Sequence, residues 1–324
     1  MSRISETLVA SPRNMIDVRR LAQSYGIHIA LLTLILISAI LSPAFLSAGN
    51  VSNMLLQIAP LGIVVVGQTL VILVRGLDLS VASVMATAAA VATSFSGQNG
   101  DAATIVMVAL AIGLLTGLVN GLLVTKRNVS PFLATLATMI VLQGLRFAYT
   151  QGAPSGNVPP FFRAVGSQLF YGIPYNLMIM GVLAIIFSVI LRRSTFGRKV
   201  YITGGNPITA RLVGINADRI TIACYLASGA LAALAGLVLS GFVGVVDNWV
   251  GRGFELDSIV AAVMGGVALS GGRGTIAGAL TGATILVVVF NAALLLGLPI
   301  EFQILIKGII IIIAAAFYVR RSEA

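Results

Sequence analysis

The sequence predicts an all-α polytopic membrane protein with about ten transmembrane helices. Hydrophobic residues make up 58% of the 324 residues and charged residues only 9%, whereas soluble domains contain about 25% charged residues. A helix needs about 20 predominantly apolar residues to cross a bilayer, and apolar segments near that length fill most of the chain. Lys and Arg gather in alternate connections between these segments, as cytoplasmic loops require.

The predicted elements follow one another with short connections. Residues 1–26 are polar and basic and are expected to form a cytoplasmic tail, residues 27–319 a single transmembrane domain, and residues 320–324 a second cytoplasmic tail. No small-residue cleavage site follows the first span, so we expect it to be retained. The spans are expected at 27–46, 53–74, 80–96, 102–124, 131–150, 175–191, 221–243, 255–270, 275–296 and 302–319.

The basic residues also set the orientation. With the N-terminus inside, most of the 20 Lys and Arg residues fall in cytoplasmic segments, above all in the connection 192–220. An even number of spans then places both termini in the cytoplasm. The net charge of +10 is therefore interpreted as a signal of membrane orientation and not of nucleic-acid binding.

A short motif is repeated in the two halves of the chain. Residues 75–79 read Arg-Gly-Leu-Asp-Leu, and residues 252–256 read Arg-Gly-Phe-Glu-Leu. Each copy precedes one of the shortest spans, and in this topology the copies lie on opposite sides of the membrane. This predicts two inverted repeats, spans 2–5 and 7–10, with a solute path where they meet. A chance match within an apolar chain is the alternative explanation.

Polar residues within or beside the spans are candidates for lining that path, because polar side chains at membrane depth are costly and often functional. Amides are also common as contacts between helices. We expect Asp78 to brace the break in the chain rather than to bind solute, with Ser80 capping the helix that begins near Val81 and Asp257 capping span eight. Amides and hydroxyls suit a neutral sugar or polyol. The candidates are Gln68, Asp78, Ser80, Asn120, Gln143, Asn291 and Gln303.

Several classes of chemistry are excluded. One Cys and one His rule out a disulfide framework and a His/Cys metal cluster, and no metal or cofactor is expected. The sequence contains no GxxxxGK[ST] phosphate loop, so the chain is not expected to be an enzyme that hydrolyses ATP by that route. Residues 272–277 fit a loose dinucleotide-binding pattern, but they connect two spans and are interpreted as a tight turn.

The basic connection 192–220 contains a short amphipathic segment. Glycines at 204, 205 and 214 permit sharp turns, and Pro207 fits the first turn of a helix. Such a helix would offer apolar residues, among them Ala210, to a groove on another protein. The alternative is a plain basic loop held inside by its charge.

These motifs resemble those of the ribose-type permease subunits of bacterial ABC importers for monosaccharides, over roughly residues 50–320. The matching stretches are 76–81, 204–215, 253–266 and 271–278. The resemblance implies a location in the bacterial inner membrane, a cytoplasmic ABC ATPase, a periplasmic solute-binding protein and a second permease copy, identical or related. It also implies that a coupling helix docks on the ATPase, with candidate residues Gly204, Gly205, Asn206, Ala210, Arg211, Gly214 and Ile215. Arg75 and Ala82 depart from the family pattern, which usually has Gly at both positions.

Other functions stay open at this point. A branched-chain amino-acid ABC permease would need a charged pair in the path to hold a zwitterion, and no clear pair is visible. A gradient-driven secondary transporter would need intramembrane carboxylates, for which Asp78 is the only candidate. A membrane-embedded enzyme would need clustered carboxylates or His at the membrane surface, which the sequence lacks.

Overall fold

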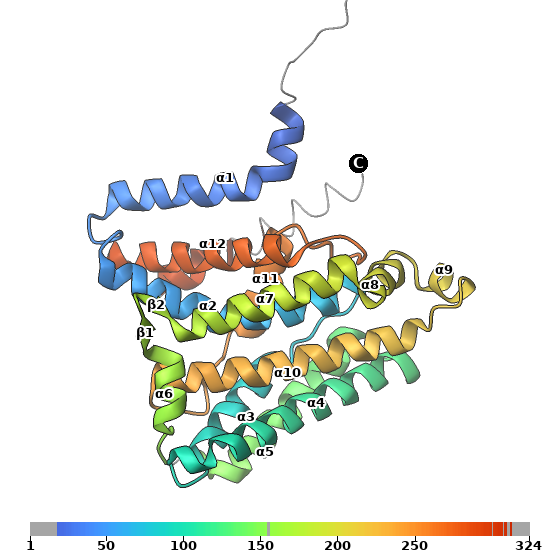
Figure 1. Ribbon diagram of the computed structural model, residues 1–324, viewed down its shortest axis with the longest axis horizontal. Helices are drawn as coiled ribbons and strands as arrows, with labels where there is room; N and C mark the ends of the chain where they lie inside the picture. Colours follow the sequence, from blue (N-terminus) through green and yellow to red (C-terminus); the bar gives the residue numbers. More distant parts are fainter. Residues whose placement is uncertain (1–17, 154–155, 300, 307, 310–311, 313–324) are drawn as a thin grey trace, which may run out of the picture.

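The computed structural model describes residues 18–153, 156–299, 301–306, 308–309 and 312. These residues form a helical bundle with one small β-hairpin, β1 and β2, at one end (Figure 1). The elements are α1 (Val18–Leu41), α2 (Ala48–Leu73), α3 (Val81–Thr93), η1 (Asn99–Asp101), α4 (Ala102–Lys126), α5 (Pro131–Thr150), α6 (Pro160–Ser167), β1 (Leu169–Phe170), β2 (Ile173–Pro174), α7 (Tyr175–Arg193), α8 (Thr195–Gly205), α9 (Pro207–Leu212), α10 (Ala217–Val243), α11 (Phe254–Met264) and α12 (Ile276–Leu295).

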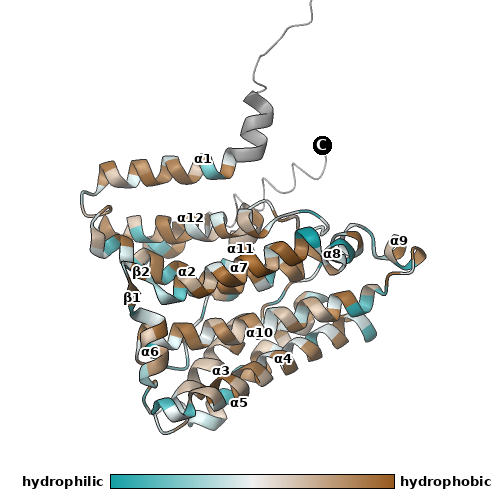
Figure 2. Cartoon of the chain, in the orientation of Figure 1, coloured by the Kyte–Doolittle hydropathy of each residue, from teal (hydrophilic) through white to brown (hydrophobic). Residues whose placement is uncertain are grey.

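Six of these helices are long and apolar enough to cross a membrane, namely α2, α4 with the turn before it, α5, α7, α10 and α12. Two shorter apolar helical stretches are Gly26–Leu41 in α1 and Val81–Thr93. Figure 2 shows hydrophobic residues along the long helices and hydrophilic residues at their ends. The chain is therefore an all-α multi-pass membrane protein.

Most predicted spans agree with the helices to within a few residues, but α1 and α11 differ from the prediction. The helix α1 begins at Val18 and not at residue 27, so it includes the end of the stretch expected to be a tail. The span 131–150 coincides with α5. However, α1 ends at Leu41 and not at residue 46, because Pro43 disfavours helical backbone at the residue before it. The helix α11 ends at Met264 and not at residue 270, because Gly266 takes a left-handed φ of +84°. The span 302–319 lies mostly outside the described residues, as do most of the tail 1–26 and all of 320–324.

Both long connections fold as their composition suggests. The described residues of the connection 151–174, which is rich in Pro and Gly, contain the eight-residue α6 and the hairpin and no longer helix. The connection 192–220 contains α8 and α9. Pro207 occupies the first turn of α9, and the Asn206 side chain caps that helix by accepting hydrogen bonds from the N–H groups of Ile208 and Thr209.

The two longest buried helices, α2 and α10, form the centre of the bundle and pack against each other. On one side α10 also contacts α3 and α4, and on the other side α2 contacts α11 and α12. Each half of the protein thus has a long central helix, a short helix after a break in the chain, and another long helix that packs on the opposite central helix.

Glycines bring α4 and α10 into backbone contact. A Cβ atom added at Gly117 would overlap the backbone carbonyl of Tyr225, and one added at Gly113 would overlap that of Gly229. Small residues permit this close approach in membrane bundles, where helix association depends on packing.

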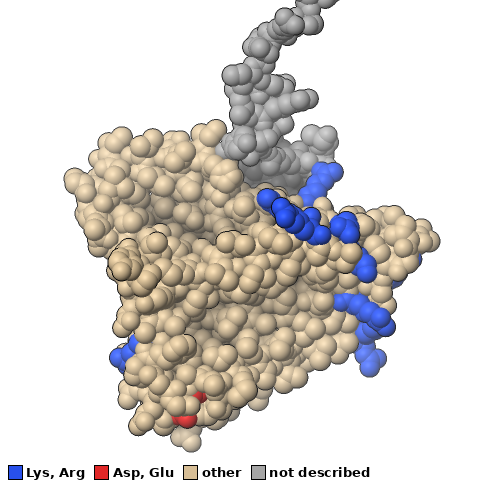
Figure 3. Space-filling model, in the orientation of Figure 1, with Lys and Arg blue, Asp and Glu red and all other residues tan. Residues whose placement is uncertain are grey.

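Charged residues mark the two ends of the bundle differently. Figure 3 shows most of the visible Lys and Arg side chains at the end that carries α8 and α9. The helix α7 reaches this end with Arg192 and Arg193 in its last turn, and α4 reaches it with Lys126. The hairpin and α6 lie at the opposite end (Figure 1).

Candidate functional site

The chain breaks sharply between α2 and α3. The N–H of Gly76 donates to the carbonyl of Val71 at 2.9 Å, and Arg75 between them takes a φ of +66°. This ending, with a left-handed residue just after the helix, usually contains glycine. It turns residues 77–80 into the interior of the bundle, where Asp78 is completely buried.

The carboxylate of Asp78 braces this break. Its Oδ1 accepts hydrogen bonds from the backbone N–H of Ser80 at 3.0 Å and from the Ser80 hydroxyl at 2.5 Å. Its Oδ2 accepts one from the hydroxyl of Ser228 on α10 at 2.8 Å. The Tyr225 hydroxyl, also on α10, donates to the carbonyl of Leu77 at 3.2 Å. Because a buried polar group is costly without partners, these bonds fix the break against α10.

Two further predicted residues complete the same buried cluster. When its amide is oriented to satisfy its neighbours, Gln68 on α2 donates to the carbonyl of Asp78 at 3.1 Å and accepts from the N–H of Asp78 at 3.2 Å. Asn120 on α4 donates to the Ser80 hydroxyl at 2.9 Å and accepts from the hydroxyl of Thr138 on α5 at 2.7 Å. The cluster therefore joins five helices: α2, α3, α4, α5 and α10.

The two predicted helix caps are wrong in detail. Ser80 precedes α3, but its side-chain oxygen accepts from the Asn120 amide and not from an N–H of that helix. The helix α11 begins at Phe254 with Gly253 as its cap residue, so Asp257 lies within the first turn. There the Glu255 side chain accepts from the N–H of Gly253 at 2.8 Å.

The other three candidates lie apart from the cluster. Asn291 on α12 is buried and exchanges two hydrogen bonds with Asn50 near the start of α2, at 2.9 and 2.8 Å. Gln303 is half-buried and donates to the carbonyl of Leu298 at 2.9 Å. Gln143 is half-buried on α5. The structure thus brings together four of the seven sequence-predicted residues.

A second polar group holds α5 in place. Arg146 is only 5% exposed; its guanidinium donates to the carbonyl of Asn248 at 3.0 Å and to that of Ser83 on α3 at 3.3 Å. The Asn248 side chain in turn donates to the Thr150 hydroxyl at 3.0 Å. This group fastens the end of α5 both to α3 and to the connection before α11.

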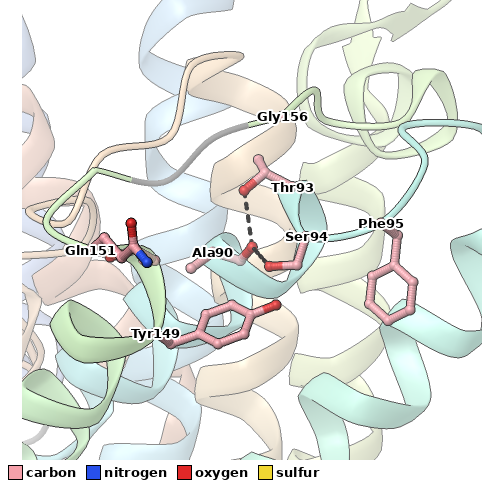
Figure 4. A pocket seen from close by; sticks show the side chains of 8 residues that line it. Ala90, Thr93, Ser94, Phe95, Tyr149, Gln151 and Gly156 are labelled. Carbon is pink, nitrogen blue, oxygen red and sulfur yellow. Dashed lines mark hydrogen bonds between the residues drawn. The ribbon is translucent and has the colours of Figure 1, made fainter.

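A cavity of about 500 Å³ opens beside this group, between the C-terminal ends of α3 and α5 (Figure 4). The hydroxyls of Thr93 and Ser94 donate to the carbonyl of Ala90 at 2.9 and 2.8 Å, which leaves their oxygens free to accept. Figure 4 shows the aromatic ring of Tyr149 extending below them in this view. The lining residues are Ala90, Thr93, Ser94, Phe95, Tyr149, Thr150, Gln151 and Gly156.

The predicted coupling segment lies at the opposite end of the bundle. Gly204 and Gly205 end α8 against the end of α2, where the N–H of Gly272 donates to the carbonyl of Leu73 at 2.9 Å. Arg211 on α9 forms an ion pair of 2.9 Å with Asp218, which also pairs with Lys126 on α4 at 2.7 Å. The segment is therefore tied to α2, α4 and α10.

An exposed apolar patch forms the tip of this segment. Ile208 is 70% exposed, Leu212 82% and Val213 64%, and Figure 1 shows α9 projecting from the bundle. The sequence predicts that Ala210 is part of this surface. That prediction is wrong, because Ala210 is buried. The helix closes through Gly214, whose φ is +79°, and a 2.9 Å bond from the N–H of Ile215 to the carbonyl of Ala210.

Sequence reasoning missed several residues of these clusters. Ser228 and Thr138 are single hydroxyls within apolar helices, where a hydroxyl commonly bonds its own helix and gives no signal of a distant partner. Asn50 falls before the predicted span 53–74, and Asn248 falls in a connection. Only their tertiary contacts reveal them.

Residues 50–315 match the family described as the branched-chain amino acid transport system permease component. The chain is 40% identical to the ribose import permease protein of Escherichia coli K12, with 88% of this chain and 90% of that protein covered. It is 38% identical to the ribose import permease protein of Bacillus subtilis, with 93% and 94% covered. The fructose import permease protein of Rhizobium meliloti is 35% identical, with 91% of this chain and 85% of that protein covered. No solved structure matches the chain.

Proposed function

The chain belongs to the family of branched-chain amino acid transport system permease components, and from this premise we propose that it is the membrane subunit of an ATP-driven importer for a neutral monosaccharide or polyol. The cavity between α3 and α5 carries the proposal. The described residues that line it offer hydroxyls, an amide and two aromatic rings, without a charged side chain. Sites for small ligands combine apolar walls with a few placed polar groups, and this set suits a solute rich in hydroxyls.

The two ends of the bundle suit different partners. The exposed patch of Ile208, Leu212 and Val213 is the proposed docking point for a cytoplasmic ABC ATPase, since an apolar helix face inserts readily into a groove. A periplasmic solute-binding protein would deliver the sugar at the opposite end, beside the cavity. A second permease copy, identical or related, would complete the pore, and this chain itself would not hydrolyse ATP.

The topology we propose has ten spans in the bacterial inner membrane, two inverted repeats, and both termini in the cytoplasm. The transmembrane permease domain would be 27–319, flanked by tails 1–26 and 320–324. The gathering of Lys and Arg at the α8–α9 end supports this orientation. The short helices α3 and α11 after matching breaks, each packed on a central helix, support the repeats.

The proposed path passes the buried cluster of Gln68, Asp78, Ser80 and Asn120. In the described conformation these side chains satisfy one another, so solute passage would require the break to move relative to α10. Gln143, Asn291 and Gln303 stay candidates for other parts of the path. Asp78 is proposed as the brace of the moving break.

Experiment can distinguish this proposal from two alternatives, one with a different substrate and one with a different energy source. A branched-chain amino-acid importer is favoured only by the family description; a zwitterion would require charged groups that the described lining of the cavity does not supply. A gradient-driven transporter would work without an ATPase.

The test is reconstitution in liposomes with the partner ATPase and sugar-loaded binding protein. We expect stable co-elution, ATP hydrolysis stimulated by the loaded binding protein, and uptake of that sugar. Uptake of leucine in place of sugar would indicate a branched-chain amino-acid importer. Solute movement by the chain alone along a gradient would overturn the ATP-driven proposal.

A further inference from the structure

Arg75 occupies a backbone position that strongly favours glycine. Helices α9, α11 and α12 end with the same turn as α2, and there the left-handed residue is Gly214, Gly266 or Gly297. The long helix α5 also ends on a left-handed residue with a side chain, Gln151, whose φ is +50°. At the end of α2 it is Arg75, with a φ of +66°. A long side chain is strained in this conformation, and such outliers cluster where a side chain has a function.

The side chain of Arg75 reaches the proposed coupling segment. Its Nε donates to the carbonyl of Gly204 at 2.6 Å, and its guanidinium also donates to the carbonyl of Gly205. These are the last carbonyls of α8, which have no partner within that helix. A cation also interacts favourably with the negative end of the helix dipole. Arg75 therefore caps the helix that leads into α9.

The backbone is tightly packed where the end of α8 meets the end of α2. A Cβ atom at Gly204 would overlap the carbonyl of Leu73, and one at Gly271 would come within 2.6 Å of Cγ of Arg75. The Tyr201 hydroxyl on α8 donates to the carbonyl of Gly274 at 2.9 Å. The end of α8, the end of α2 and the turn 271–274 are thus in direct contact.

Two residues separate Arg75 from Asp78, which is hydrogen-bonded to Ser80 and Ser228. The side chain of Arg75 therefore connects α8 to the short stretch 75–80. The carboxylate of Asp78, in the same stretch, connects it to Ser80 before α3 and to Ser228 on α10. A displacement of α8 and α9 would act on the break through this guanidinium.

We propose that Arg75 transmits movement of the α8–α9 segment to the break between α2 and α3, as a positioning residue for transport. This inference rests on the proposed importer function. It predicts that loss of the guanidinium separates ATP hydrolysis from solute movement while the ATPase still docks.

The variant Arg75→Gly tests this directly. Glycine adopts the left-handed conformation without strain, so the variant removes the guanidinium and keeps the turn. The matched control is Arg252→Gly in the second copy of the motif, whose guanidinium lies 4.8 Å from the Trp249 ring centroid, away from α8. The variant Arg75→Lys keeps a cation with its own N–H donors and should restore part of the function.

The measurement is sugar taken up per ATP hydrolysed, in liposomes that contain the ATPase and the loaded binding protein. Thermal unfolding and co-elution with the ATPase are measured for each variant. We expect Arg75→Gly to co-elute with the ATPase but to show at least a five-fold lower ratio of sugar taken up to ATP hydrolysed. The ratio for Arg75→Lys should lie between those of Arg75→Gly and wild type. The ratio for Arg252→Gly should equal that of wild type.

The proposal is overturned if the ratio for Arg75→Gly equals that of wild type, even where uptake and hydrolysis fall together. Loss of co-elution would also overturn it, because Arg75 would then only hold the docking segment in shape. A wild-type complex without ATP-driven uptake would instead refute the importer function itself, so the two failures are distinguishable.

Discussion

The hydroxyl of Ser228 donates a 2.8 Å hydrogen bond to Oδ2 of Asp78, and this bond fixes the middle of α10 to the break between α2 and α3. The same carboxylate accepts from Ser80. The two central helices and the short helix α3 are therefore joined through one side chain.

Replacing this carboxylate should lower stability. In Asp78→Asn the amide nitrogen cannot accept a hydrogen bond, so a buried donor loses its partner at a cost of about 1–3 kcal/mol. We expect a lower midpoint of thermal unfolding in detergent, followed by circular dichroism. Asp247→Asn, at an exposed position, is the control and should unfold near the wild-type temperature. Equal midpoints for the two variants would contradict the bracing role.

The contact between α4 and α10 should tolerate no added methyl group. Gly117→Ala places a Cβ against the backbone of Tyr225, and overpacking of this kind costs about 1–3 kcal/mol or more. Gly144→Ala on α5 meets nothing within 4 Å and should be neutral or stabilising. Yield of folded protein and thermal unfolding in detergent compare the two. A stable Gly117→Ala variant would show that these helices separate more easily than their geometry indicates.

The cavity between α3 and α5 should control solute entry. Tyr149→Ala removes an aromatic wall that is 69% exposed, and we expect the initial rate of sugar uptake to fall several-fold at low sugar concentration. Tyr171→Ala removes a ring that is 92% exposed and lies outside the cavity lining, so uptake should be unchanged. Similar losses in both variants would argue against the cavity as an entry site.

The apolar tip of α9 should carry ATPase docking. Leu212→Glu puts a charge into a contact that would be desolvated on binding, and we expect at least a ten-fold loss of co-purified ATPase. Val245→Glu is the matched control, since Val245 is 83% exposed and Leu212 82%, and Val245 follows α10 at the other end of the bundle. Retained docking by Leu212→Glu would assign the interface to another surface.

The proposed orientation predicts which residues a membrane-impermeant maleimide reaches in spheroplasts. In a Cys224→Ala background, Tyr171→Cys should be labelled from the periplasm. Ile208→Cys, at a position 70% exposed, should react only after the membrane is disrupted. The reverse pattern would place the coupling segment outside and exclude the ATPase proposal.

Hydropathy was sufficient to predict most helices, because the length and polarity of a span depend on local composition. It failed at α1 and α11, where Pro43 and Gly266 end helices inside apolar runs. The residues of the polar cluster were partly predictable, since Gln68 and Asn120 are conspicuous within apolar spans. Their partners Thr138 and Ser228 were not, because only packing of distant helices brings these hydroxyls to them.

The glycine contacts between α4 and α10 also limit how the protein changes shape. Backbones that touch at Gly113, Gly117 and Gly229 cannot slide by a fraction of a turn without steric overlap, so these two helices should behave as one rigid body. Alternating access would then consist of other elements pivoting around a fixed α4–α10 pair. The distance between spectroscopic labels on α4 and α10 should therefore stay constant through the ATP cycle. Displacements of the other helices can then be measured relative to this pair of helices.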